Sequence, residues 1–236
     1  MIKFLKKIDR RIRYFLMCDT ETCNTISHNG KLDMSNALTY DIGVAVCDKR
    51  GKIYLTKSYI VKEIFFGMRD LMQSAYYANK IPQYLKDIEE GKREVKSWYE
   101  IRKEIMEICE QFEIDTIVSH NARFDNNTLK VTQRYNTYSK YRFYLPFNFK
   151  YYDTLKMAQD TICKQKRYIK FCEENGYMTK HKTPRPRATA EILYRYITGH
   201  NEFVESHTGL EDCLIEAQIL AHCYRQHKKM RKALYE

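Results

Sequence analysis

The sequence predicts an α/β protein built on one mixed sheet, and three observations support this fold class. Three segments with strand character follow one another within residues 13–61. Strand and helix patterns then alternate over residues 97–155, and the rest of the chain is mostly helical in pattern. Successive strands favour a meander, and alternation with helices favours layered α/β packing. We therefore expect a single domain over residues 1–236, with a mixed five-stranded sheet and flanking helices.

The strand patterns are short and bounded by polar residues. The first, RYFLMCD at 13–19, is an apolar run typical of a fully buried strand. The second, at 37–48, and the third, at 52–61, are separated by the turn signal DKRG. These three are expected to form an antiparallel meander. The remaining two are DTIVSH at 115–120 and FKYYDTL at 149–155.

The helices are predicted from apolar periodicity and from the residues that end them. Apolar residues recur at helical spacing over 97–112, which predicts an amphipathic helix. A helix over 121–135 follows the fourth strand, with Asn121 as its expected N-cap. Further helices are expected at 154–163, at 164–175 closed by Gly176, at 188–198 closed by Gly199, and at 209–228.

The segment 63–97 departs from this alternation. It is long, charged and helix-prone, and Pro82 is expected to divide it into two helical pieces. We interpret it as a helical insertion or variant segment within the domain.

Composition narrows the class of protein. No apolar stretch reaches the roughly eighteen residues that a membrane span needs. The basic N-terminal residues lack a continuous apolar region, so no signal peptide is expected. None of the eight cysteines forms a C-x-x-C motif, which favours reduced thiols. We expect a cytoplasmic protein with no membrane partner, located in the host cytoplasm if it is viral.

The chain is basic, with 41 Lys and Arg against 30 Asp and Glu and a net charge of +11. Such an excess can serve solubility alone, or it can match a polyanionic partner such as nucleic acid. The bias towards Lys, Tyr, Ile and Asn is compatible with an AT-rich genome, such as that of some bacteriophages or low-GC bacteria.

Two acids, Asp19 and Glu21, stand where the first predicted strand ends. Residues at i and i+2 of a strand point to the same face, so the two carboxylates converge. Like charges held together are costly unless a cation neutralises them, and carboxylate oxygens suit Mg²⁺ or Mn²⁺. Taken alone, the pair also fits two solvated acids at a strand end.

Three further polar residues lie near predicted helix starts. Asp125 falls in the first turn or so of its helix, where the helix dipole favours an acid. Asp212 lies off the apolar stripe of the last helix and so need not be buried. His207 precedes Asp212 by five residues and can approach it. Each alone fits an exposed surface residue, but their order along the chain with the strand-end acids indicates one site.

At this point the sequence resembles the DEDDh 3′–5′ exonucleases, which include the proofreading epsilon subunit of bacterial replicative polymerase and ribonuclease T. The family motif D-x-E-T resembles DTET at 19–22, H-N-a-x-F-D resembles HNARFD at 120–125, and H-x-A-x-x-D resembles HTGLED at 207–212. The likeness runs from about residue 14 to 225. It implies a ribonuclease H-like fold and metal-dependent release of nucleoside 5′-monophosphates from a 3′ end.

The resemblance also implies roles for individual residues. Two metal ions, Mg²⁺ or Mn²⁺, would be held by the acids of the three motifs, and His207 would be the general base that deprotonates the attacking water. Thr22 would hold the terminal 3′-OH. The implied metal ligands, which are also the catalytic acids, are Asp19, Glu21, Asp125 and Asp212.

Further residues are candidates for binding the nucleic-acid strand. Lys166 and Arg167 lie in a helical stretch interleaved with aromatic residues, and Arg185 and Arg187 lie in a basic loop. Cations interleaved with aromatics suit contact with a single-stranded backbone and its bases, although a solvated basic helix has the same pattern. Phe124 could stack on a base or pack in the core.

The sequence departs from the family in two of its motifs. Asn24 stands where the first motif often has Gly, and Gly209 replaces Ala in the third motif, a change expected to matter little. DNA is the expected substrate, single-stranded or at a 3′ terminus. An exoribonuclease that trims RNA is the alternative, and a non-catalytic nucleic-acid-binding module is a further one. A polymerase or other replication protein is a candidate partner, and the sequence indicates no particular oligomeric state.

Overall fold

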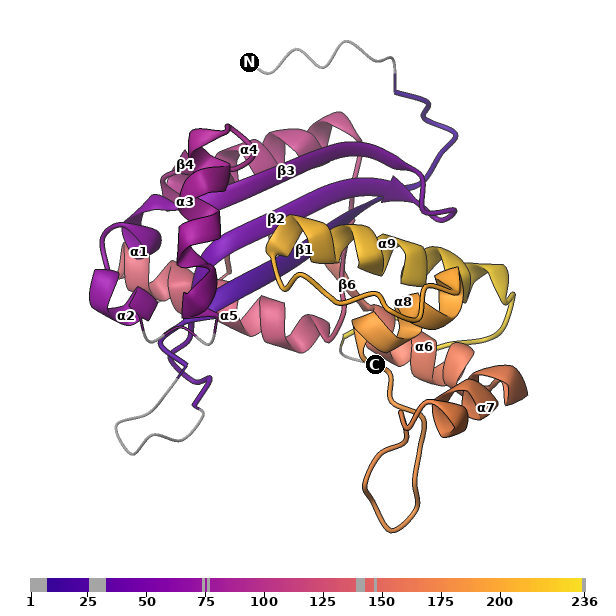
Figure 1. Ribbon diagram of the computed structural model, residues 1–236. Coiled ribbons are helices and arrows are strands. Elements are labelled where there is room, and N and C mark those ends of the chain that lie inside the picture. The colour runs from indigo at the N-terminus through magenta and orange to yellow at the C-terminus, as the bar shows by residue number, and fades with distance from the viewer. Residues whose placement is uncertain are drawn as a thin grey trace.

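The computed structural model describes residues 8–25, 33–73, 75, 77–138, 143–146 and 148–234. Within these residues, six strands form one sheet in the order β4-β3-β2-β1-β5-β6 (Figure 1). The strands are β1 (Tyr14–Cys23), β2 (Leu38–Asp48), β3 (Ile53–Val61), β4 (Glu94–Lys96), β5 (Thr116–Ser119) and β6 (Lys150–Asp153).

The predicted mixed sheet is confirmed. β1, β2 and β3 form the expected antiparallel meander, while β5 pairs with β1, β6 with β5 and β4 with β3, all in parallel. β1 does not end at Asp19 as predicted but continues to Cys23 with a register shift after Glu21. The cause is β2, which offers Gly43 and Asp41 as partners opposite Asp19 and Glu21.

The sheet has one strand more than predicted, and it lies at the end of the segment 63–97. This segment contains α1 (Lys62–Phe65), α2 (Arg69–Gln73), η1 (Ala78–Lys80), α3 (Ile81–Glu89) and β4. Pro82 stands in the first turn of α3 rather than between two helices. The N–H groups of a first turn have no partner within the helix, so the missing N–H of proline costs nothing there. β4 is too short for its alternation to be visible in the sequence, and only pairing with β3 defines it.

The remaining helices lie close to their predicted bounds. They are α4 (Trp98–Gln111), α5 (Ala122–Thr137), α6 (Thr154–Asp160), η2 (Ile162–Lys164), α7 (Lys166–Glu174), α8 (Ala190–Thr198) and α9 (Gly209–Arg225). Ser97 and Glu100 form a capping box at the start of α4. Asn121 does precede α5, but it has a left-handed backbone and makes no side-chain cap hydrogen bond.

Alternation along β1 distributes its side chains between two cores. Leu16 packs on the face covered by α4 and α5, and Phe15 and Met17 pack on the face covered by α6, α8 and α9. Figure 1 shows α9 lying across β1 and β2. By the same alternation, Asp19 and Glu21 lie on the α9 face. The sheet therefore presents both acids to the start of that helix.

Among the described helices, none combines the length and apolar character that crossing a membrane requires. All eight cysteines are free, and all but the partly exposed Cys163 are buried.

Candidate active site

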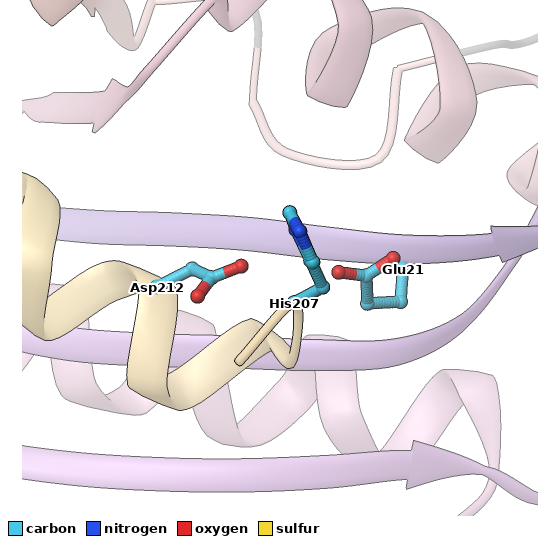
Figure 2. Close-up of side chains that lie close together, drawn as sticks. All are labelled: Glu21, His207 and Asp212. Atoms are coloured by element: carbon cyan, nitrogen blue, oxygen red, sulfur yellow. The ribbon is translucent and has the colours of Figure 1, made fainter. Parts of the chain in front are cut away.

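The site forms where the start of α9 meets β1. Glu21, His207 and Asp212 offer ligand atoms that all lie within 4.8 Å of one another. Figure 2 shows the His207 side chain between those of Asp212 and Glu21. Residues nearly two hundred positions apart in the chain thus converge, as the sequence predicted. This group contains two carboxylates and an imidazole, a donor set that suits a divalent cation.

Backbone-to-backbone contact between two glycines brings α9 this close to the sheet. A Cβ added to Gly43 on β2 would lie 1.9 Å from the carbonyl carbon of Gly209, and one added to Gly209 would lie 2.5 Å from the Gly43 nitrogen. Asp41 Oδ2 also accepts a hydrogen bond of 2.9 Å from the Gly209 N–H. Gly in place of the family's usual Ala at position 209 is expected from the sequence to matter little, but in this structure a methyl group at this position has no room beside Gly43.

Asp125 is buried rather than a surface acid at the start of α5, with only 3% of its surface exposed. Its Oδ1 accepts hydrogen bonds from the Thr20 N–H at 3.1 Å and the Thr20 hydroxyl at 2.9 Å. Its Oδ2 is buried and has no hydrogen-bond partner. These bonds hold the carboxylate against β1 at Thr20, which lies between Asp19 and Glu21.

Asp212 is also buried, although its place off the apolar stripe did not require burial. It is 5% exposed, whereas the apolar Leu214 on the same helix is 36% exposed. α9 turns its Asp212 face to the sheet because the glycine contact sets its rotation. The Asp212 Oδ1 is buried without a hydrogen-bond partner, which is consistent with a role as a metal ligand.

Glu216 lies one turn after Asp212 on the same face of α9, and sequence reasoning missed it. It is 2% exposed, its Oε1 accepts a 3.0 Å hydrogen bond from the His120 N–H, and its Oε2 has no partner. The available signal was the i, i+4 spacing of two acids behind the third motif. Glu216 is surrounded in the α9 sequence by apolar residues, so it did not stand out as a site acid.

Burial and mutual repulsion raise the pKa of each acid in the site. Burial, followed by the neighbouring Asp41 and Asp212 carboxylates, raises the pKa of Glu21 to about 9. Burial and the Glu205 carboxylate raise the pKa of Asp212 to about 8, and burial raises that of Asp125 to about 7. The pKa of Asp19 is raised in the same way. Acids so placed gain most from a bound cation.

These observations fit a divalent metal ion. Carboxylates converge from β1, α5 and α9, and three of them, Asp125, Asp212 and Glu216, leave a buried oxygen unpartnered. His120, by contrast, holds the scaffold: its ring nitrogens lie 2.9 Å from the Thr154 hydroxyl and 2.7 Å from the Ala188 carbonyl.

Asp19, Glu21, Asp212 and Glu216 line a cleft of about 1620 Å³, whereas Asp125 is not among its lining residues. Thr22 and the half-buried Phe124 line the same cleft, as do Arg185 and Arg187. The two arginines lie on a hairpin closed by backbone hydrogen bonds, one from the Thr179 N–H to the Arg185 carbonyl. Other cations in the lining are Lys164, Lys182 and Arg231.

Lys166 and Arg167 are placed differently. Both are exposed on α7, and neither is among the residues that line the cleft. The structure thus separates the four candidate cations: all four are exposed, but only the two on the hairpin line the cleft.

No protein-family model and no curated protein sequence matches the chain. Solved structures do. The nuclease domain of 3′hExo, a DEDDh family member, bound to rAMP, is 14% identical with a TM-score of 0.55, covering 96% of this chain and 100% of that one. A 3′-exonuclease structure on 3′-end-specific recognition of the histone mRNA stem-loop is 14% identical with a TM-score of 0.56, covering 95% and 87%.

The chain has the ribonuclease H-like fold of these exonucleases. The mixed sheet with flanking helices matches theirs over nearly the whole of this chain. At this identity the likeness concerns the fold, so the roles of individual residues rest on the geometry given above.

Proposed function

We propose that this chain is a metal-dependent 3′–5′ exonuclease of the DEDDh type, acting on single-stranded or 3′-terminal DNA and releasing nucleoside 5′-monophosphates. The observation that supports this most is the convergence of Glu21, His207 and Asp212, with ligand atoms within 4.8 Å, in a cleft lined by cations. The exonuclease domain would span residues 1–236.

The acids would bind metal and His207 would move the proton. Asp19, Glu21, Asp125 and Asp212 would hold two Mg²⁺ or Mn²⁺ ions, which when bound activate water and stabilise the leaving oxygen. The His207 imidazole would take the proton of the attacking water. Burial and the Lys80 ammonium lower the pKa of His207, so its ring stays neutral and able to accept a proton near neutral pH.

The cleft would hold the 3′ end of the strand. Thr22, on β1 beside the acids, would bind the terminal 3′-OH, and Phe124 would stack on a base. Arg185 and Arg187 would contact the phosphate backbone.

The test is a paired degradation assay on 5′-labelled single-stranded DNA and RNA of one sequence. We expect stepwise shortening from the 3′ end in Mg²⁺ or Mn²⁺, release of 5′-monophosphates, and complete loss of hydrolysis in EDTA that either ion restores. Hydrolysis that persists in chelator would contradict the metal-dependent mechanism. Strand binding without any hydrolysis would favour the non-catalytic module.

An exoribonuclease is the second candidate. The observation that favours it is that the similar structures concern rAMP and a histone mRNA stem-loop. In the paired assay, this function would make RNA the faster substrate by a large margin.

Changing Arg185 and Arg187 together to Ala is expected to weaken binding of a labelled oligonucleotide in EDTA. Each arginine that neutralises a phosphate adds about 0.7 to the slope of log K against log salt for a single strand, so the slope should fall by about 1.4. Lys166→Ala with Arg167→Ala is the matched control, since it removes the same charge outside the cleft lining. If the control pair lowers the slope as much, the strand runs over α7 instead.

A further inference from the structure

His207 has a backbone conformation that needs support. Its φ is 49°, in the left-handed region that residues with a Cβ rarely adopt. Such a conformation is strained and persists only where surrounding contacts over-determine it. The direction of the imidazole depends on this backbone, because the side chain is partly exposed. Within its own loop, the imidazole Nδ1 lies 3.8 Å from a Glu205 carboxylate oxygen, a distance that is too long to fix the ring.

The contacts that support His207 come from the segment 63–97. Lys80 Nζ, at the end of η1, donates hydrogen bonds to the carbonyl oxygens of Ser206 and His207, the latter at 3.3 Å. The Tyr77 ring stacks on the imidazole, with centroids 4.7 Å apart and planes 15° from parallel. Lys80 Nζ also lies 4.7 Å from the centroid of the Tyr77 ring. One residue thus holds the loop backbone and the other the ring.

The segment is itself fixed to the same part of the fold. The Tyr84 hydroxyl on α3 donates to Asp41 Oδ2 at 2.7 Å, and the buried Arg93 pairs with Asp87 at 3.0 Å and Asp41 at 3.5 Å. Asp41 Oδ2 also accepts the Gly209 N–H that starts α9. The segment 63–97 and the start of α9, which flank His207, are therefore both bonded to the one buried carboxylate of Asp41.

We propose that Tyr77 and Lys80 are positioning residues that hold His207 for proton transfer, so that the segment 63–97 is a clamp on the catalytic loop. This inference rests on the proposed function for its catalytic consequence. Stacking restricts rotation of the imidazole about its Cβ–Cγ bond, and the two carbonyl hydrogen bonds keep the loop in its left-handed turn. Lys80 is also attracted to Glu21 and Asp212, which keeps its ammonium beside the site.

The test compares Tyr77→Ala with Tyr77→Phe, which keeps the stack. In the metal-free full-length protein, the ring current of Tyr77 should shift the Cε1–H NMR signal of His207 upfield, with the signal assigned from His207→Gln. Tyr77→Ala should move it towards the position of an exposed histidine, and Tyr77→Phe should leave it near the wild-type position. In Mg²⁺, Tyr77→Ala should lower kcat by up to about 100-fold with KM little changed, as expected for a misplaced catalytic group.

The matched control is Tyr99→Ala, which removes a 70% exposed tyrosine from α4. It should change neither the His207 signal nor kcat. Lys80→Met should lower kcat as Tyr77→Ala does, with partial recovery in Lys80→Arg. A His207 signal unmoved in Tyr77→Ala, or a rise in KM with kcat unchanged, would overturn the clamp. The NMR measurement needs no substrate, so it tests the Tyr77–His207 stack independently of activity. A wild-type chain that hydrolyses nothing would overturn the proposed function, and the NMR shift would still show whether Tyr77 stacks on His207.

Discussion

Replacing Asp212 by Asn should abolish hydrolysis and, at the same time, raise the stability of the metal-free protein. Asp212 is 5% exposed, and its Oδ1 has no hydrogen-bond partner. Without metal, burial and the neighbouring Glu205 carboxylate raise its pKa to about 8, so at neutral pH the folded protein must bind a proton there, which costs stability. With metal it would be a ligand. Losing several kcal/mol of transition-state stabilisation corresponds to about 10³-fold in rate. Relief of about 1 kcal/mol of repulsion raises Tm by about 2–4 °C in a chain of this size.

The measurement is thermal unfolding in EDTA and in Mn²⁺, together with single-turnover hydrolysis. Wild-type protein should gain stability when Mn²⁺ is added, and Asp212→Asn should gain much less. Asp9→Asn is the control, because Asp9 lies outside the site, is partly exposed and is hydrogen-bonded to Arg11, which lowers its pKa to about 2. It should not gain stability in EDTA and should keep full activity. A metal-free Asp212→Asn protein that melts below the wild type would contradict the repulsion argument.

Replacing Gly43 by Ala is expected to destabilise the protein and inactivate it together. The new Cβ would lie 1.9 Å from the Gly209 carbonyl carbon and 2.1 Å from the Leu210 nitrogen. Both atoms are backbone and cannot turn away, so α9 must lift from β2 and take Asp212 with it. Overpacking of this kind costs about 3 kcal/mol, which lowers Tm by about 6–12 °C.

Gly176→Ala separates the clash from the general cost of replacing a glycine. Gly176 has a φ of 72° but nothing within 4 Å of an added Cβ. It should cost about 1–2 kcal/mol through its left-handed backbone and leave kcat unchanged. Gly209→Ala should act in the same direction as Gly43→Ala, since its Cβ would lie 2.5 Å from the Gly43 nitrogen. Wild-type Tm and activity in Gly43→Ala would show that the helix does not approach the sheet this closely.

The sheet and most helices could be predicted because their signals are local. The apolar run before Asp19 and the helix started by Ser97 and Glu100 depend on neighbours a few residues away. β4 could not be found in this way, because three residues paired with β3 carry no period of their own. The same reason explains the early predicted end of β1, which continues only because β2 lies beside it.

The candidate site divides in the same way. The motif residues Asp19, Glu21, Asp125, His207 and Asp212 were all named from the sequence, through their order along the chain and the resemblance of their motifs to those of the DEDDh exonucleases. Their burial was not foreseen, because it depends on how α9 is rotated against the sheet. Glu216 was missed for that reason, and the outward position of Lys166 and Arg167 on α7 likewise depends on tertiary packing.

By itself, the sequence determined the fold class and most of the element order and proposed the motif acids with their histidine, since each follows from residues that are close along the chain or from their order. Only the tertiary structure decided which acids are buried, which cations line the cleft, and that Tyr77 and Lys80 lie against His207. The physical reason is that these properties arise from contacts between distant segments. The approach of Gly43 to Gly209 sets the place of α9, and no local pattern encodes that distance.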